Sequence, residues 1–194
     1  TQSVLIPVFK EYGVPKRMTM DNGNPWGVAQ RNRHWTKFAI WLMDLGITVS
    51  HSTPLHPQTQ GKDERFHRSL KYEVLNRHQF LNGRHLQRVC DTWRTLYNEQ
   101  RPHEALGLDV PADYYQPSSK AYKAKPDHYE YDSADIIRSV HTRGDVRFKG
   151  QTFNIGVSFY RKTVALRETK TDGCYDVYYR HQKVARIDLR TGNV

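Results

Sequence analysis

The chain contains 194 residues, with 30 lysines and arginines against 20 aspartates and glutamates, and its formal net charge is +10 at pH 7. A positive charge of this size is typical of a protein that binds a polyanion, most simply nucleic acid. Apolar stretches are too short for the roughly 20 residues of a membrane-spanning helix. Two cysteines, Cys90 and Cys174, are too few for a disulfide scaffold or a four-thiolate zinc site. We therefore expect an intracellular protein with reduced thiols.

The first part of the chain alternates helical and strand patterns. Apolar residues recur at helical spacing from Leu5 to Tyr12, and Gly13 ends this first helix. The elements predicted next are a strand at 17–20, a helix at 35–45, a strand at 47–50, and helices at 60–76 and 86–97. This alternation predicts an α/β domain.

The tail has a different pattern. From 116 to 135, two prolines and scattered charge without apolar periodicity predict a linker. Short strand patterns follow at 145–149, 151–155, 163–168, 174–180 and 183–189. About five short strands predict a small antiparallel barrel. We therefore expect an α/β domain at 1–115, a linker at 116–135 and a small all-β domain at 136–194.

Asp21 is the first candidate for chemistry, because it directly follows the strand predicted at 17–20 and precedes an Asn-Gly pair. A carboxylate in this position is held by the sheet while its oxygens can face a cleft. The alternative is that Asp-Asn-Gly only turns the chain, as such tripeptides commonly do. Both interpretations stay open on these residues alone.

Glu64 is the second candidate, on the helix predicted at 60–76. Helical spacing brings other polar residues to its face, namely Gln60, His67, Arg68 and Lys71. Phe66 and Leu70 lie on another face and would dock the helix. The alternative is a solvated face with Glu64 and Arg68 as an ion pair four residues apart, worth a few tenths of a kcal/mol.

Together these segments resemble the catalytic core of bacterial insertion-sequence transposases of the retroviral-integrase superfamily. The matching stretches are TMDNG at 19–23, LGITVSHSTPLHPQTQGKDERFHRSLKYEVL at 45–75 and LYNEQRPHEALGLDVPADYY at 96–115. Their order and spacing make the resemblance specific. It extends more loosely to the tail, where such transposases often carry a small β-barrel. The resemblance implies a partial ribonuclease-H-like integrase core followed by an SH3-like barrel.

By this resemblance, Asp21 and Glu64 would be the second and third carboxylates of an Asp-Asp-Glu triad that holds Mg²⁺ or Mn²⁺. They stand 43 positions apart, somewhat more than is customary, with the surplus at 25–33. Phosphoryl transfer in DNA uses two divalent metals about 3.5–4 Å apart, and Mg²⁺ binds carboxylates together with water and substrate oxygens. Asp63 is a weaker candidate, because it is rotated about 100° from Glu64 around the same helix.

The family's first aspartate lies on a strand upstream of the helix with which this chain starts. Before Asp21 the chain has one acidic residue, Glu11, within a helical pattern. We therefore expect an incomplete triad and no strand transfer by this polypeptide alone. The chain starts at Thr1 without a methionine, either because the methionine is removed or because the chain is cut from a longer protein.

Polar residues on or beside the Glu64 helix are expected to contact DNA phosphates, with an affinity that depends on salt and little on sequence. They are Gln58, Lys62, Arg65, Arg68 and Lys71. Cations of the tail form a second DNA-contacting face or ordinary exposed charge: Arg143, Arg147, Lys149, Arg161 and Lys162. Solvated surface charge is the alternative for both groups.

Other conspicuous residues predict no further chemistry. The spacings of His51, His56 and His67 match no zinc site. Tyr97-Asn98 and Arg101-Pro102-His103 end the fourth helix, and we interpret them as structural.

The sequence thus predicts a DNA transposase or integrase of the bacterial cytoplasm and nucleoid, acting on transposon ends and target DNA by metal-dependent cleavage and transfer. The alternative is a catalytically inactive remnant that only binds DNA or assembles with full-length transposase. A nucleic-acid-binding module unrelated to transposition is disfavoured by the Asp21 and Glu64 segments. Without upstream strands, the strand at 17–20 would expose an edge, so we expect a homo-oligomer formed through the first domain.

Overall fold

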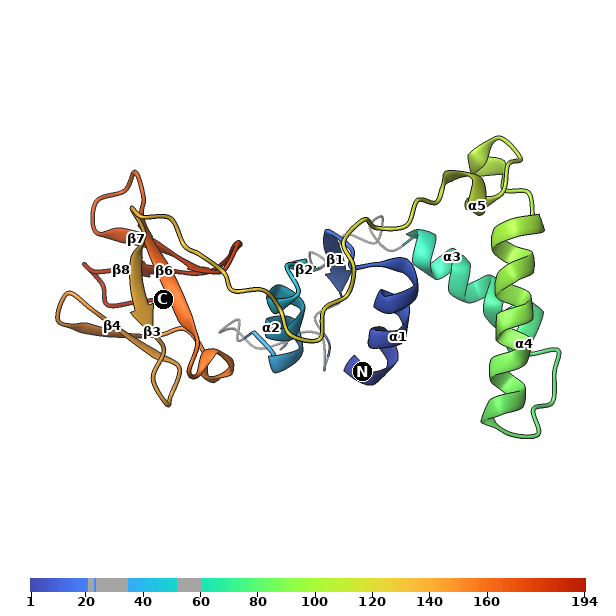
Figure 1. The fold of residues 1–194 in the computed structure, drawn as a ribbon, viewed down its shortest axis with the longest axis horizontal. Helices are drawn as coiled ribbons and strands as arrows, with labels where there is room; N and C mark the ends of the chain where they lie inside the picture. Colours follow the sequence, from blue (N-terminus) through green and yellow to red (C-terminus); the bar gives the residue numbers. More distant parts are fainter. Residues whose placement is uncertain (21–22, 24–34, 52–60) are drawn as a thin grey trace. The chain divides into compact units, whose positions relative to one another are not determined.

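The computed structural model describes residues 1–20, 23, 35–51 and 61–194, apart from the side chain of Lys62. The chain, drawn in Figure 1, forms two compact units. The first unit consists of Thr1–Ser52 together with Ser118–Val194, and the second unit is Thr53–Pro117. The structure therefore contains both helices and sheets, as predicted. The domain limits expected from the sequence, at 115 and 136, stay a prediction.

The first unit begins with helix α1 (Gln2–Tyr12), which confirms the first predicted helix. Gly13 ends the helix with a φ of 78°, and a Cβ there would lie 2.4 Å from the carbonyl oxygen of Ser118, so only glycine fits. Phe9 is buried. Val8, which the helical pattern placed on the apolar stripe, is 41% exposed, because it is rotated about 100° from Phe9 around the helix.

Two strands of the first unit form a parallel pair. Strand β1 (Arg17–Met20) runs beside β2 (Thr48–His51), with Arg17 opposite Thr48 and Met20 opposite His51. Helix α2 (Lys37–Asp44) precedes β2 and buries nearly all of its apolar side chains. The helix starts later than the predicted 35, because the Thr36 side chain accepts a hydrogen bond from the Ala39 amide and so caps it.

The tail is all-β, as predicted. Its strands are β3 (Ile136–Ser139), β4 (Asp145–Phe148), β5 (Gln151–Asn154), β6 (Thr163–Glu168), β7 (Cys174–Tyr179) and β8 (Gln182–Asp188). They form an antiparallel sheet in the order β3-β6-β7-β8 and a separate β4-β5 hairpin. The sequence did not predict β3, which is defined by its pairing with β6. The β4-β5 turn at Lys149 and Gly150 has positive φ at both residues, as a two-residue hairpin turn of type I′ requires.

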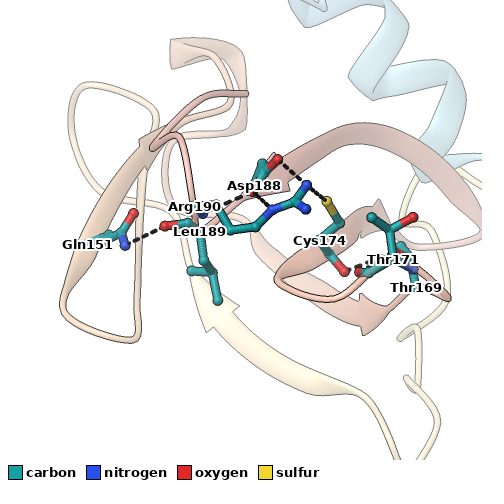
Figure 2. A network of polar contacts seen from close by, with 7 residues as sticks. All are labelled: Gln151, Thr169, Thr171, Cys174, Asp188, Leu189 and Arg190. Carbon is teal, nitrogen blue, oxygen red and sulfur yellow. Dashed lines mark hydrogen bonds and ion pairs between the residues drawn. The ribbon is translucent and has the colours of Figure 1, made fainter.

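Polar contacts join this hairpin to the end of β8 (Figure 2). Gln151 Nε2 donates to the carbonyl oxygen of Leu189 at 2.9 Å. Arg190 pairs with Asp188 at 2.7 Å and donates to Cys174 Sγ at 3.4 Å. The hydrogen bonds from Arg190 hold the pKa of the Asp188 carboxyl well below its usual range. These contacts attach the turn after β8 to the β4-β5 hairpin and to β7 of the four-stranded sheet.

Most of the segment predicted as a linker belongs to the first unit. The described residues 116–135 form no helix or strand. The Ser118 amide nevertheless donates to the Tyr12 carbonyl at 3.0 Å, and the Val14 amide donates to the Lys120 carbonyl at 2.7 Å. Further along, Arg167 Nε lies 2.7 Å from Asp135 Oδ1. The composition of the segment thus predicted its irregular backbone but not its tertiary contacts.

The second unit is helical. Helix α3 (Gly61–Leu70) continues into a π-helical turn, η2 (Lys71–Leu75), and helix α4 (Gly83–Thr95) continues into a second one, η3 (Leu96–Gln100). A 3-10 turn η4 (Glu104–Leu106) and a short helix α5 (Pro111–Tyr114) follow. The helices predicted at 60–76 and 86–97 are confirmed, and the π turns, η4 and α5 were missed. Across the described part of the chain, no helix has the length and apolar character needed to span a bilayer.

Candidate nucleic-acid and metal-binding helix

Aromatic packing attaches α3 to α4. The Phe66 ring lies 5.5 Å from the Trp93 ring and 5.5 Å from the Tyr97 ring. Trp93 and Tyr97 in turn lie 4.8 Å apart. Val74 follows Phe66 and Leu70 along the same stripe and is buried. The apolar stripe predicted for this helix therefore faces α4, and the opposite face of α3 is left outward.

Glu73, in the π turn η2, joins α4 to the residue that follows η3. Its Oε2 accepts a 2.8 Å hydrogen bond from Trp93 Nε1, and its Oε1 accepts a 2.6 Å hydrogen bond from Arg101 Nη1. The hydrogen bond from Trp93 and the charge of Arg101 outweigh burial and hold the pKa of Glu73 below its usual value. Arg101 also lies over the Tyr97 ring at 5.4 Å. We name Glu73, Trp93, Tyr97 and Arg101 the Glu73 clasp.

The residues that end the fourth helix contact one another, and the structural interpretation of them stays a prediction. His103 Nε2 lies 3.3 Å from the Tyr97 carbonyl oxygen, and its ring packs edge-on to Tyr97 at 4.8 Å. Arg101 belongs to the Glu73 clasp. The sequence did not identify Glu73 itself, because its partners stand 20 and 28 positions away and no short-range pattern joins them.

The outward face of α3 carries carboxylates beside cations. Glu64, Arg65, Arg68 and Lys71 are all exposed. Among the described side chains of α3, Asp63 pairs with His67 at 3.4 Å, and no ion pair joins Glu64 to Arg68. The surface pair considered for these two residues is therefore not formed, and the Glu64 carboxylate faces solvent.

Three of the residues predicted for the site fall outside the described part of the structure: Asp21, Gln58 and the side chain of Lys62. Within the described part, no three His, Cys, Asp or Glu side chains form a group that could hold a metal ion. The exposed oxygens of Glu64 are of the type that Mg²⁺ and Mn²⁺ accept as ligands. Glu64 therefore fits such an ion as one ligand of several.

The cations of the tail differ in their surroundings. Lys162 Nζ lies 2.8 Å from Asp44 Oδ2, so it faces α2, and Lys149 Nζ donates to the Tyr175 hydroxyl at 2.8 Å. Arg161 lies over the Tyr160 ring at 5.2 Å. Arg143 and Arg147 are exposed. Lys162 is thus paired inside the first unit, while a DNA-contacting role for these five residues stays a prediction.

Two family models match this chain. Residues 45–111 match the model described as "Integrase core domain". Residues 135–194 match the model described as "IS481 family transposase, C-terminal domain". The chain belongs to the insertion-sequence transposases of the integrase superfamily. Within this transposase chain, the integrase-core match includes β2 and the helices α3 and α4, and the C-terminal match includes all strands from β3 to β8.

Curated relatives agree with this assignment. The chain is 31% identical over 104 residues to "Insertion element IS407 uncharacterized 31.7 kDa protein" of Burkholderia multivorans, an alignment covering 53% of the chain and 34% of that protein. It is 30% identical over 104 residues to "Putative integrase ORF3" of Spiroplasma virus SpV1-C74, covering 50% and 28%. It is 28% identical over 102 residues to "Insertion element IS476 uncharacterized 39.2 kDa protein" of Xanthomonas euvesicatoria, covering 53% and 28%. The matched part of the chain spans about a third of the length of these relatives or less.

Proposed function

We propose that this chain is part of a transposase that cuts and joins DNA by metal-dependent phosphoryl transfer. The observation that carries the proposal is the outward face of α3, where Glu64 stands free of an ion pair among the described side chains and beside the exposed Arg68 and Lys71. The match to the integrase core domain over 45–111 supports it. In this proposal, Glu64 and Asp21 are metal-binding carboxylates, and the ions are Mg²⁺ or Mn²⁺.

The residues of the proposed site have two tasks, metal binding and DNA binding. A bound divalent ion supplies Lewis-acid stabilisation of the phosphate oxygens. Glu64 holds that ion through its carboxylate. The cations of α3 bind the DNA backbone and fix its register, because phosphate contacts position a protein on DNA without reading its sequence. The residues we assign to this task are the cations Lys62, Arg65, Arg68 and Lys71, together with the neutral Gln58 before the helix.

The Glu73 clasp positions the site. It fixes α3 against α4 through Trp93 and Arg101, so the outward face keeps one direction. Lys71 begins the π turn η2 that contains Glu73. Because π-helical turns are often found at functional sites, we include η2 in the proposed DNA-binding surface.

Further parts of the proposal concern the fold and the partners. We propose a ribonuclease-H-like arrangement for the integrase core and an SH3-like arrangement for the strands of the tail. Transposon ends and target DNA are the proposed substrates, within the bacterial nucleoid. We also propose a homo-oligomer formed through the edge of β1 that pairs with no strand of the described residues, because an unpaired strand edge favours pairing with another chain.

The site can be tested by metal binding and by DNA cleavage. We expect Mn²⁺ to broaden the amide resonances of α3 in the chain, and Glu64→Gln to abolish this broadening while the control Asp63→Asn retains it. In a transposase that contains this chain, we expect Glu64→Gln to abolish Mg²⁺-dependent nicking of plasmid DNA and leave DNA binding intact. DNA binding without nicking by the unaltered transposase would favour the inactive, DNA-binding alternative. Unchanged nicking by Glu64→Gln would contradict the proposed site.

A further inference from the structure

Tyr72, in the π turn η2, exposes its aromatic ring to solvent. The residue is 61% exposed, although the guanidinium carbon of Arg77 lies 5.0 Å from the centre of its ring. The Arg77 amide donates a 3.2 Å hydrogen bond to the carbonyl oxygen of the buried Val74, so the backbone holds Arg77 beside η2. One side of the ring is thus paired with a cation, while much of the ring stays accessible.

A second pair of arginine and tyrosine in this unit shows how a ring used for packing differs. Arg101 lies over the half-buried Tyr97 ring, and both side chains belong to the Glu73 clasp. Among the described residues, no second aromatic ring packs on Tyr72 and its hydroxyl makes no hydrogen bond. Arg77 contributes less than Arg101 to the lowered pKa of Glu73. The Tyr72 ring therefore adds little to the fold and is available to a partner.

Cations surround Tyr72 along the chain. Arg68 lies one helical turn before Tyr72 on the same side, Lys71 directly precedes it, and both are exposed, as is Arg77. The adjacent carboxylate of Glu73 has both oxygens in hydrogen bonds of the clasp. Proteins bind single-stranded nucleic acid with this combination, in which cations contact the phosphates and an aromatic ring stacks on a base. The surroundings of Tyr72 therefore fit a nucleotide better than an apolar partner.

We propose that Tyr72 stacks on an unpaired base of the DNA bound at α3, and that Arg68 and Arg77 contact the flanking phosphates. The base is unpaired because the bases of an intact duplex are already stacked on one another and are costly to extrude. The inference rests on the proposed DNA-binding function and adds that the bound DNA has an unpaired end or an opened base pair.

The position of Tyr72 relates this base to the proposed metal site. Glu64, Arg68 and Tyr72 follow one another at steps of four residues, and a rise of 1.5 Å per residue places Tyr72 about 12 Å beyond Glu64 along the helix. A DNA strand advances about 3.4 Å per nucleotide. The stacked base therefore lies within about four nucleotides of a phosphate held at Glu64.

The test compares binding of the chain to two DNAs of random sequence, a blunt duplex and the same duplex with a short single-stranded overhang. Wild type should bind the tailed duplex more tightly than the blunt one. Tyr72→Ala should weaken binding of the tailed duplex by about tenfold and leave the blunt duplex nearly unchanged. Tyr72→Phe keeps the ring and should retain the preference. Tyr114→Ala removes another exposed tyrosine of the second unit and is the control, with the preference retained.

Salt dependence separates stacking from charge. Tyr72→Ala removes no charge, so the slope of log affinity against log salt should stay unchanged for the tailed duplex. Arg77→Gln should flatten this slope by about 0.7, the value for one phosphate contact of a single strand. An unchanged slope in Arg77→Gln would overturn its phosphate contact.

Three other results would overturn the stacking while binding of the blunt duplex, and with it the proposed function, persists. They are equal affinity of wild type for both DNAs, loss of the preference in Tyr72→Phe, and an equal loss in Tyr72→Ala and Tyr114→Ala. Absence of binding to either DNA by wild type would overturn the proposed function as well.

Discussion

The two units of this transposase chain are held together in different ways. In the first unit, α2, β2 and the tail strands share one buried apolar cluster. In the second unit, Val74 and Trp93 are the buried apolar side chains among the described residues. The helix that carries Glu64 thus depends on one aromatic and ionic attachment rather than on a large core. The proposed site is therefore held in place by a few side-chain contacts. Single substitutions can disrupt these contacts without disturbing the core of the first unit.

The largest effect is expected from the apolar core of the first unit. Phe153 is 1% exposed, and Phe153→Ala should lower the free energy of unfolding by about 4 kcal/mol, through lost burial and a cavity. Denaturant unfolding of the full chain measures this loss. Val157→Ala is the control, because Val157 is 62% exposed. A similar loss for both variants would contradict the assignment of Phe153 to the core.

Trp93→Ala should have the largest effect on the second unit, at about 3 kcal/mol. The substitution removes the ring contacts with Phe66 and Tyr97 and the hydrogen bond to Glu73. Hydrogen exchange resolved by segment should then speed up in α3 and α4 while the amides of β6 and β7 stay protected. Faster exchange in β6 and β7 as well would show that the two units do not differ as described.

Glu73→Gln should have a smaller effect, about 1 kcal/mol, because the amide keeps an acceptor for Trp93 and the lost ion pair with Arg101 is partly exposed. The effect depends on pH. The folded-state pKa of Glu73 is lowered from 4.5, so its contribution is present above that value and is lost as the pH falls through the folded pKa. Exchange protection of α3 should therefore drop as the pH falls below 4.5. In Glu73→Gln this drop should be weaker; an identical pH profile would contradict the clasp.

Glu64→Gln should have the smallest effect on stability, within about 0.5 kcal/mol, because the side chain is exposed and unpaired among the described residues. The same variant is expected to abolish metal binding. Thermal unfolding with and without Mn²⁺ measures both: the ion should stabilise wild type and leave the variant unchanged. A large loss of stability without metal would mean that Glu64 supports the fold instead.

The sequence predicted the elements whose pattern is local. Phe66, Leu70 and Val74 recur at helical spacing and do face the protein interior, because a helix repeats its faces every three to four residues. Contacts between residues far apart in the sequence produce no local pattern and could not be predicted. Glu73 and Trp93 stand 20 positions apart, and Asp44 and Lys162 stand 118 positions apart.

By itself, the sequence determined the family, the order of most helices and strands, and Glu64 with its neighbouring cations as an outward polar face. Only the tertiary structure decided which charged side chains are paired within the protein and which are exposed to solvent. Lys162 and Arg68 are both cations that the sequence offered as DNA contacts. In the structure, Lys162 is paired with Asp44, whereas Arg68 is exposed on α3. The physical reason is that periodicity assigns a residue to a face of its own element, whereas the partner of a charge depends on which other element packs against that face.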